Sequence, residues 1–348
     1  MNIFLIVFAG ILLLFTLLSM IRNDYWTFRI FDYPRLQKLV LSVVCLALLI
    51  IFYTNADIWY WVAISLISVN ILYLFYQVLP FTPLGSKQVL RADEHDPDQS
   101  ISLMISNVYQ YNKNTNGCLQ EIRKANPDVV FLLETDKNWK DGTEELEKDY
   151  PYHVWVPQEN TYGMLLYSKL ELTDTEVKFM VEDDIPSIHT HVLLKDNTKV
   201  ALYGVHPTPP SPTENIRSTE RDKELLLVAD LVKEQDLPVI VIGDLNDVAW
   251  SHTTKLFLKM SGLLDPRRGR GFFNSFHAKY PFMRFPLDHA FISTDFKLKM
   301  IKRLNSYGSD HFPIFINLQH EVKADKEQDS MPYDSEDVEE ANEKKAKE

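Results

Sequence analysis

Two short polar segments near the end of the chain carry residue types that suit metal-assisted chemistry. Asp244 and Asn246 come directly after an apolar, β-branched run, and Asp310 and His311 come shortly before another. Such runs are typical of buried strands, so each segment places polar side chains at the end of a strand. Two carboxylates, a carboxamide and an imidazole gathered there suit a hard divalent cation and a phosphate ester.

Four further polar residues occupy the same kind of position. They are Asn107, Glu134, His206 and Asp288, each at the end of a strand-like run. Mg²⁺ prefers a few carboxylate and carboxamide oxygens plus water, and a histidine held by a carboxylate suits acid–base work near neutral pH. If the fold brings these strand ends together, they form a site at one edge of a packed core.

The region that must position these residues alternates strand-like and helix-like segments. Strands are expected near 101–105, 129–133, 152–156, 163–167, 187–194, 200–205, 239–242, 287–292 and 314–318. Helices are expected at 117–125, 213–233 and 257–263, the second with its Glu and Arg side chains in water. Mixed strands, few helices and long loops indicate an α/β (α+β) fold, a two-layer β-sandwich flanked by helices.

Seven segments that include these residues resemble the endonuclease/exonuclease/phosphatase family, whose members share a metal-dependent phosphodiesterase domain. They occur in the family order and span roughly residues 101–318. They are ISNV (105–108), PDVVFLLE (127–134), GMLLYS (163–168), GVHP (204–207), IGDLND (242–247), LDH (287–289) and SDHFPI (309–314). Three apolar segments before them make the chain similar to a bacterial membrane-anchored branch of the family.

The resemblance implies a metal site and a divalent cation, Mg²⁺ or Mn²⁺. Glu134 resembles the principal metal carboxylate of the family, with Asn107 beside it. Asp310 is similar to a carboxylate on the metal side of the site. The implied activity is hydrolysis of a phosphoric ester by metal-activated water, as in phosphodiesterases and endonucleases.

The resemblance also implies catalytic roles for five residues. Asp244 and Asn246 look like the pair that aligns the attacking water and holds a phosphate oxygen. His206 and His311 are similar to the two histidines that contact the scissile phosphate and transfer protons. Asp288 looks like the acid that orients His311.

Other assignments of the polar residues were considered. Asp288 could instead pair with Arg284, and His206 before a proline could be a packed loop residue. His289 is expected to point to the opposite face of its strand from Asp288. A zinc site from His189 and His191 lacks a further ligand nearby, and a serine hydrolase is excluded because the sequence has no Gly-x-Ser-x-Gly motif.

The substrate class stays open between nucleic acid and a lipid or small-molecule phosphoester. Tyr109 stands where DNA-repair members of the family carry an acid. Arg268 and Arg270, which precede Phe272, are candidates to bind a phosphate or a headgroup, or form a solvated basic loop. The formal net charge of −12 argues against tight non-specific DNA binding. A non-catalytic membrane scaffold is a further alternative, and nothing in the sequence indicates an obligate protein partner.

Composition divides the chain into four parts. Residues 1–80 are predicted to be a membrane anchor of three transmembrane helices, Ile3 to Met20, Leu39 to Tyr53 and Ile58 to Leu79. A cleaved signal peptide and a re-entrant second segment are the alternatives. Residues 81–100 are expected to form a linker, and 101–320 the catalytic domain. Residues 321–348, with 11 acids and 5 lysines, are expected to be a disordered acidic tail.

The distribution of cations predicts an orientation in the cell membrane. Arg22, Arg29, Arg35 and Lys38 lie between the first two apolar segments, and the link between the second and third has no Lys or Arg. The positive-inside rule therefore predicts a multi-pass protein whose catalytic domain is cytoplasmic. The two cysteines lie in different parts of the chain, which makes a disulfide or a cysteine metal site implausible.

Overall fold

Two β-sheets packed face to face form the globular part of the chain. The structure, a computed structural model, describes residues 1–92 and 96–347. One sheet has the strand order β10-β11-β1-β2-β4-β3, and the other has the order β5-β6-β7-β8-β9. The first contains β1 (Ser100–Asn107), β2 (Val129–Leu133), β3 (Tyr152–Val156), β4 (Met164–Ser168), β10 (Phe296–Arg303) and β11 (Ile314–His320). The second contains β5 (Leu172–Lys178), β6 (Ser187–Leu193), β7 (Lys199–Val205), β8 (Val239–Asp244) and β9 (Asp288–Ile292). The predicted two-layer fold is confirmed.

The main core lies between the sheets, because alternate side chains of each strand face the opposite layer. Leu103 and Phe131 of the first sheet share one buried apolar cluster with Leu202 and Ile240 of the second. The layers approach closely at Gly204, where an added Cβ would lie 2.7 Å from the Phe131 ring. A larger residue at this position would push the sheets apart.

Helices cover the outer faces of the sandwich. Against the first sheet lie α5 (Thr115–Ala125), α6 (Lys137–Gly142) and the 3₁₀ helix η2 (Glu144–Lys148). Against the second lie α7 (Thr219–Lys233) and α8 (His252–Ser261). The helix expected from residue 213 therefore starts six residues later, and its Arg221 and Glu224 are buried instead of solvated. Strands β5 and β10 were not expected from the sequence.

Residues 321–347 of the acidic tail are ordered in this structure, contrary to the prediction. They contain the 3₁₀ helix η3 (Ala324–Lys326) and α9 (Ser335–Ala346), which packs against α7 and α8. Asp334 caps α9 by accepting hydrogen bonds from the first-turn backbone, and Ala341 is buried in the cluster under α7 and α8. Composition alone missed this helix because its stabilising partners lie 78 residues or more away in the chain.

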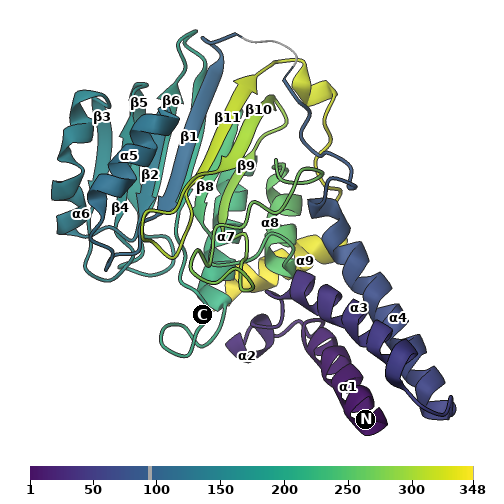
Figure 1. Cartoon of the computed structure of the whole chain (residues 1–348). Coiled ribbons are helices and arrows are strands. Elements are labelled where there is room, and N and C mark those ends of the chain that lie inside the picture. Colours follow the sequence, from purple (N-terminus) through teal and green to yellow (C-terminus); the bar gives the residue numbers. More distant parts are fainter. Residues whose placement is uncertain (93–95, 348) are drawn as a thin grey trace.

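The N-terminal helices project together from one end of the sandwich (Figure 1). They are α1 (Asn2–Leu18), the short α2 (Trp26–Arg29), α3 (Arg35–Phe52) and α4 (Ile58–Val78), which continues as the 3₁₀ helix η1 (Leu79–Phe81). Two helical segments, Arg35–Phe52 and Ile58–Phe81, are long and apolar enough to cross a membrane. The predicted count of three is therefore too high, because α1 has 17 residues and spans only about 26 Å against a hydrocarbon core of about 30 Å.

The cations from Arg29 to Lys38, two of which lie in the first turn of α3, have a structural role that the sequence did not reveal. Arg29 and Arg35 both pair with the buried Asp32. Lys38, 2 % exposed, donates hydrogen bonds to the carbonyls of Phe15 and Phe31. Three of the four residues that set the predicted orientation thus also make contacts that join the N-terminal helices.

The segment predicted as a linker, 81–100, partly joins the sandwich. Val89 is buried in the main core, and Arg91 pairs with Leu298 on β10. The predicted linker also includes residues 93–95, which lie outside the described residues.

Candidate active site

Six strand ends meet at the end of the sandwich that faces the N-terminal helices, and they carry the candidate site residues. In Figure 1, β1 runs from the opposite end of the sandwich toward those helices. The parallel pairs β1–β2 and β7–β8 bring their carboxyl ends to this edge. Asn107 ends β1, Glu134 follows β2, and His206 follows β7. Asp244 ends β8, Asp288 begins β9, and Asp310 and His311 precede β11.

Strand register places two of the carboxylates side by side. Asp244 and Asp288 are directly paired across β8 and β9. Gly243, just before Asp244, has a φ of +153°, and a Cβ there would lie 1.8 Å from the Val205 carbonyl oxygen. Glycine is therefore required for β7 and β8 to approach closely where His206 and Asp244 emerge.

Asn107 joins the two halves of the sandwich at the site. Its Nδ2 donates to Oε1 of Glu134 over 2.7 Å and to Oδ2 of Asp244 over 3.1 Å. Its Oδ1 accepts the Tyr109 backbone N–H over 3.0 Å. In this arrangement Asn107 positions the two carboxylates, whereas the predicted role as a metal ligand would require Oδ1 to face the site.

His311 is held between two acidic residues. Its Nδ1 lies 2.7 Å from Oδ2 of Asp288, and its Nε2 lies 3.6 Å from Oδ2 of Asp244. Burial opposes the charged ring, but the neighbouring carboxylates outweigh this effect and raise the pKa of His311 to about 10. The alternative pairing of Asp288 with Arg284 does not occur, since Arg284 donates to the Ala278 carbonyl.

Desolvation and neighbouring charges both act on Glu134. Desolvation raises the pKa of its carboxyl to about 7, the Asn107 hydrogen bond and the His311 charge lower it, and the charges of Asp310 and Asp244 raise it. The Gln110 backbone N–H also donates to its Oε2 over 3.3 Å. A partly buried carboxyl near two further carboxylates is suited to hold a divalent cation, which would keep all three ionised.

His206 and Asn246 complete the group predicted from the sequence. His206 is 3 % exposed, its Nδ1 has no hydrogen-bond partner, and burial lowers the pKa of its ring to about 4. Asn246 has a left-handed φ of +49°, and its Nδ2 donates to the Pro207 carbonyl over 3.0 Å. The residue next to His206 therefore holds the Asn246 side chain in place.

Two supporting residues were missed by sequence reasoning. The hydroxyl of Tyr33 and Nη1 of Arg221 each donate a 2.8 Å hydrogen bond to the Asn246 backbone carbonyl. Arg221 is itself held by the buried Asp222, which accepts from its Nε and Nη2. No motif pointed to Tyr33, which lies between α2 and α3. An arginine within the apolar face of α7 was the one available signal for Arg221.

Arg268 and Arg270, predicted to bind substrate, do not join this group. The Arg268 guanidinium lies over the Phe81 ring and donates to Met331. Arg270 donates to the backbone carbonyls of Pro266 and Val89. These contacts attach the segment before Phe272 to η1 and to the segment before β1.

Three histidines outside this group have structural partners. His289 is buried between the Arg267 guanidinium and the Asp247 carbonyl. His189 pairs with Ser187, and His191 pairs with Asp174 at the edge of the second sheet. Within the described residues, the one close group of three metal-ligand side chains is Asp244, Asp288 and His311, whose ligand atoms lie within 4.8 Å of one another.

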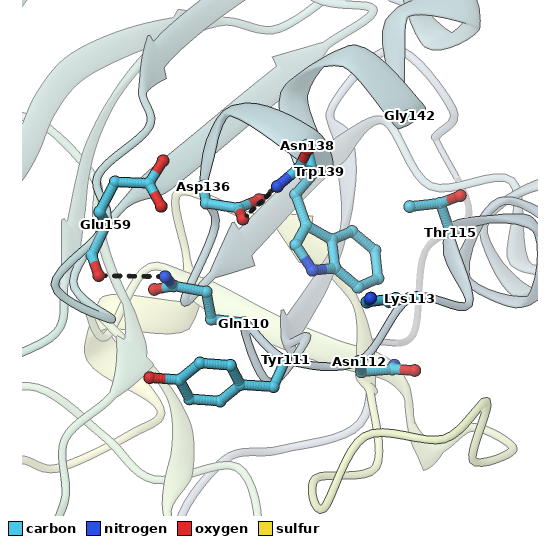
Figure 2. A pocket seen from close by; sticks show the side chains of 10 residues that line it. All are labelled: Gln110, Tyr111, Asn112, Lys113, Thr115, Asp136, Asn138, Trp139, Gly142 and Glu159. Carbon is cyan, nitrogen blue, oxygen red and sulfur yellow. Dashed lines mark hydrogen bonds between the residues drawn. The ribbon is translucent and has the colours of Figure 1, made fainter.

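A pocket of about 620 Å³ is lined by Gln110, whose backbone N–H bonds Glu134, and by nine further residues (Figure 2). The Gln110 side chain bonds the Glu159 carbonyl along one wall, and the Trp139 ring and Lys113 lie at the other end. Gln110 thus links the pocket directly to Glu134 through its backbone N–H. The remaining lining residues are Tyr111, Asn112, Thr115, Asp136, Asn138 and Gly142.

Comparison with known proteins agrees with this geometry. A family model described as Endonuclease/Exonuclease/phosphatase family matches residues 106–311, more than half of the chain. The chain belongs to this family. Its matched region begins just before Asn107 and ends at His311, so it includes every residue of the clustered site. No curated protein shows significant sequence similarity to the chain.

Solved structures with the same fold include both eukaryotic and bacterial proteins. Danio rerio TDP2 complexed with a single-strand DNA product aligns with a TM-score of 0.54 at 18 % identity, covering 64 % of this chain and 100 % of that one. An endonuclease/exonuclease/phosphatase family protein from Bacteroides thetaiotaomicron gives 0.53 at 20 %, covering 65 % and 100 %. The human Nocturnin catalytic domain with bound sulfate gives 0.53 at 16 %, covering 68 % and 97 %. The family fold thus accounts for about two thirds of the chain.

Proposed function

We propose that the chain is a divalent-metal-dependent phosphoric-ester hydrolase, with phosphodiesters as its substrates. The observation that carries the proposal is His311, held by the buried Asp288 and facing the buried Asp244, which Asn107 links to Glu134. A scaffold without catalytic activity would gain nothing from burying two carboxylates beside one imidazole, since such burial is costly.

The residues divide into a metal side and an acid–base side. Glu134 and Asp310 would hold Mg²⁺ or Mn²⁺, with Asn107 contributing if its amide turns. The cation, when bound, would polarise a phosphoryl oxygen and offset charge that develops on it. Asp244 and Asn246 are placed to orient an attacking water, and the charged His311 is placed to bind or protonate a phosphate oxygen. His206, neutral because of its burial, is suited to donate a hydrogen bond to the phosphate.

Two substrate classes fit this chemistry. Nucleic acid is one candidate, because the TDP2 structure with the same fold contains a single-strand DNA product. A phosphoester at a membrane surface is the other, because Tyr33 brings the segment between α2 and α3 into contact with Asn246. Lys113 in the pocket lined by Gln110 provides a cation for either kind of phosphate.

We also infer that α3 and α4 anchor the protein in a bilayer, with the globular domain on the cytoplasmic side. Their length and apolar composition support the anchoring, and Arg22 and Arg29 before α3, with Arg35 and Lys38 in its first turn, support the orientation. Protease treatment of intact spheroplasts tests the orientation. Cleavage of the globular domain while a cytoplasmic marker stays intact would contradict it.

The activity is tested with the full chain in detergent or nanodiscs and the soluble diester bis(p-nitrophenyl) phosphate. We expect hydrolysis that stops with EDTA and returns with Mg²⁺ or Mn²⁺. Glu134→Ala and His311→Ala should each lower the rate by about 10²–10⁴-fold. The matched controls Glu176→Ala and His191→Ala change the same residue types outside the site and should not. Activity that survives chelation or both site substitutions would refute the proposal.

A further inference from the structure

The loop between Phe276 and Phe285 is a short hairpin whose base is part of the site wall. Phe276 and Phe285 are bonded to each other through their backbones, and the Phe276 ring lies 5.0 Å from the His311 ring. The Ala278 N–H donates to the Asp310 carbonyl over 2.6 Å. The base of this loop is therefore fixed to the residues that precede β11.

The tip of the loop is apolar and points into solvent. Tyr280, Phe282 and Met283 are 60 %, 86 % and 53 % exposed. The tip folds back on itself through backbone hydrogen bonds, from Met283 to Tyr280 and from His277 to Met283. Three adjacent large apolar side chains held in water by an ordered turn are typical of a contact surface.

The same tip lies beside the start of α3. Nε2 of Gln37, in the first turn of α3, donates to the Phe282 carbonyl over 2.9 Å. One turn further along the helix, Val40 and Leu41 are 53 % and 44 % exposed, and the apolar surface of α3 continues from there to Phe52. Since Val40 is only about 4.5 Å along the helix axis from Gln37, Phe282 lies at the level where that apolar surface begins.

The charge of the loop differs from that of the whole chain. Residues 277–285 contain Lys279 and Arg284 and no acidic residue, although the chain has a formal net charge of −12. Aromatic side chains next to cations are the combination that binds at the headgroup level of a bilayer, particularly one with anionic lipids.

We propose that the tip 280–283 docks into the headgroup region of the bilayer that α3 and α4 cross, and that the site hydrolyses phosphodiesters of lipid headgroups there. The substrate part of this inference rests on the proposed function. The docking part does not, because it depends on the exposure of the tip and on its contact with α3.

The geometry favours a lipid over a nucleic acid. Nucleic-acid binding depends on cations that neutralise several successive phosphates, and the exposed part of this loop presents apolar side chains instead. A headgroup phosphate is at the same depth as interfacial aromatic residues. Phe282, at the tip of the loop, lies at that depth, and the base of the same loop lies against His311. The headgroup and the site are therefore separated only by the length of this hairpin.

Docking is tested by fluorescence quenching. Phe282→Cys in the full chain is labelled with the fluorophore NBD and reconstituted in vesicles of phosphatidylcholine and phosphatidylglycerol that contain brominated acyl chains. Val322→Cys is the matched control, because Val322 is 78 % exposed and follows β11 at the end of the sandwich away from the site. The two native cysteines are buried. We expect quenching at position 282 and none at 322; equal quenching at both would overturn the docking.

The substrate class is tested by comparing rates on those vesicles, on single-stranded DNA and on bis(p-nitrophenyl) phosphate. For Phe282→Asp we expect the ratio of vesicle to soluble-diester hydrolysis to fall about tenfold relative to the unsubstituted chain, and Val322→Asp should leave the ratio unchanged. An unchanged ratio for Phe282→Asp, or hydrolysis of DNA but not of vesicles, would overturn the lipid assignment. Absence of hydrolysis on all three substrates would refute the proposed function, and the quenching result would still decide the docking.

Discussion

The hydroxyl of Tyr33 donates a 2.8 Å hydrogen bond to the backbone carbonyl of Asn246. Tyr33 lies between α2 and α3, whereas Asn246 is a site residue 213 positions further along the chain. The Tyr33 ring also packs edge-on against Phe285 at the base of the 276–285 loop, with centroids 5.5 Å apart. One side chain of the N-terminal segment thus contacts both a residue proposed to orient water and the loop proposed to meet the bilayer.

Tyr33→Phe removes the hydroxyl and keeps the ring packing. Asn246 has a left-handed backbone conformation and depends on outside contacts to hold it. Because one neutral hydrogen bond contributes about 0.5–1.5 kcal/mol, we expect kcat to fall about two- to tenfold with little change in KM. Tyr76→Phe, at a 69 % exposed position of α4, is the control and should retain full activity. Equal kcat for both variants would show that Tyr33 does not position Asn246.

Lys344→Met should destabilise the domain through α9. The Lys344 ammonium pairs with the buried Asp222 over 2.7 Å, and Asp222 in turn holds Arg221 against Asn246. A hydrogen bond to a charged group contributes about 1.5–3 kcal/mol, and Asp222 keeps its Arg221 partner in the variant. Thermal unfolding should show this loss for Lys344→Met.

Lys345→Met is the matched control for that experiment. Lys345 is the next residue along α9 and pairs with Asp230, whose side chain is 47 % exposed. Exposed pairs contribute about 0–1 kcal/mol, so this variant should unfold close to the unsubstituted protein. A small effect at both positions would indicate that α9 does not stabilise the site.

Glu224 should make stability depend on pH. It is 3 % exposed on α7, its Oε1 has no hydrogen-bond partner, and burial, followed by repulsion from Glu182, raises its pKa to about 8. The folded state then binds a proton that the unfolded state has released, so stability falls as pH rises from the ordinary carboxyl pKa of about 4.5 to about 8.

Glu224→Gln tests this dependence, since the amide is neutral at every pH. We expect the Tm of this variant to exceed that of the unsubstituted chain at pH 8 and the difference to shrink toward pH 5. Glu220→Gln, one turn earlier on α7, provides the comparison. A Tm difference between Glu224→Gln and the unsubstituted chain that stays constant from pH 5 to pH 8 would contradict the raised pKa of Glu224.

Lys113→Met and Arg270→Met distinguish two candidate phosphate contacts. Lys113 lines the same pocket as Gln110, whereas the Arg270 guanidinium is engaged with the Val89 and Pro266 carbonyls. We expect Lys113→Met to raise KM about five- to tenfold, equivalent to about 1 kcal/mol, through loss of a charge contact with the phosphate. Arg270→Met should leave KM unchanged and lower Tm. If Arg270→Met raised KM and Lys113→Met left it unchanged, Arg270 would be the residue that contacts the substrate.

Much of the fold and of the candidate site could be predicted from the sequence, because both depend on local patterns. Apolar β-branched runs identify buried strands, and polar residues at their ends identify an edge where a site can form. Asn107, Glu134, His206, Asp244, Asp288 and His311 were recognised in this way and lie together in the structure. Strands β5 and β10 were missed because their exposed, charged residues do not resemble a buried strand.

Only the tertiary structure decided which charges are structural and which serve the site. The sequence could not show that Arg270 is bound to backbone carbonyls, that Lys38 packs α3 against the segment before it, or that α9 covers α7. Each of these depends on residues far apart in the chain that meet only after folding. The contact between Tyr33 and Asn246 is a further example. Nothing in the sequence around a tyrosine in a turn predicts which distant carbonyl its hydroxyl will bond. The sequence by itself determined which residues are available for chemistry, and the packing of distant segments decided how they are held.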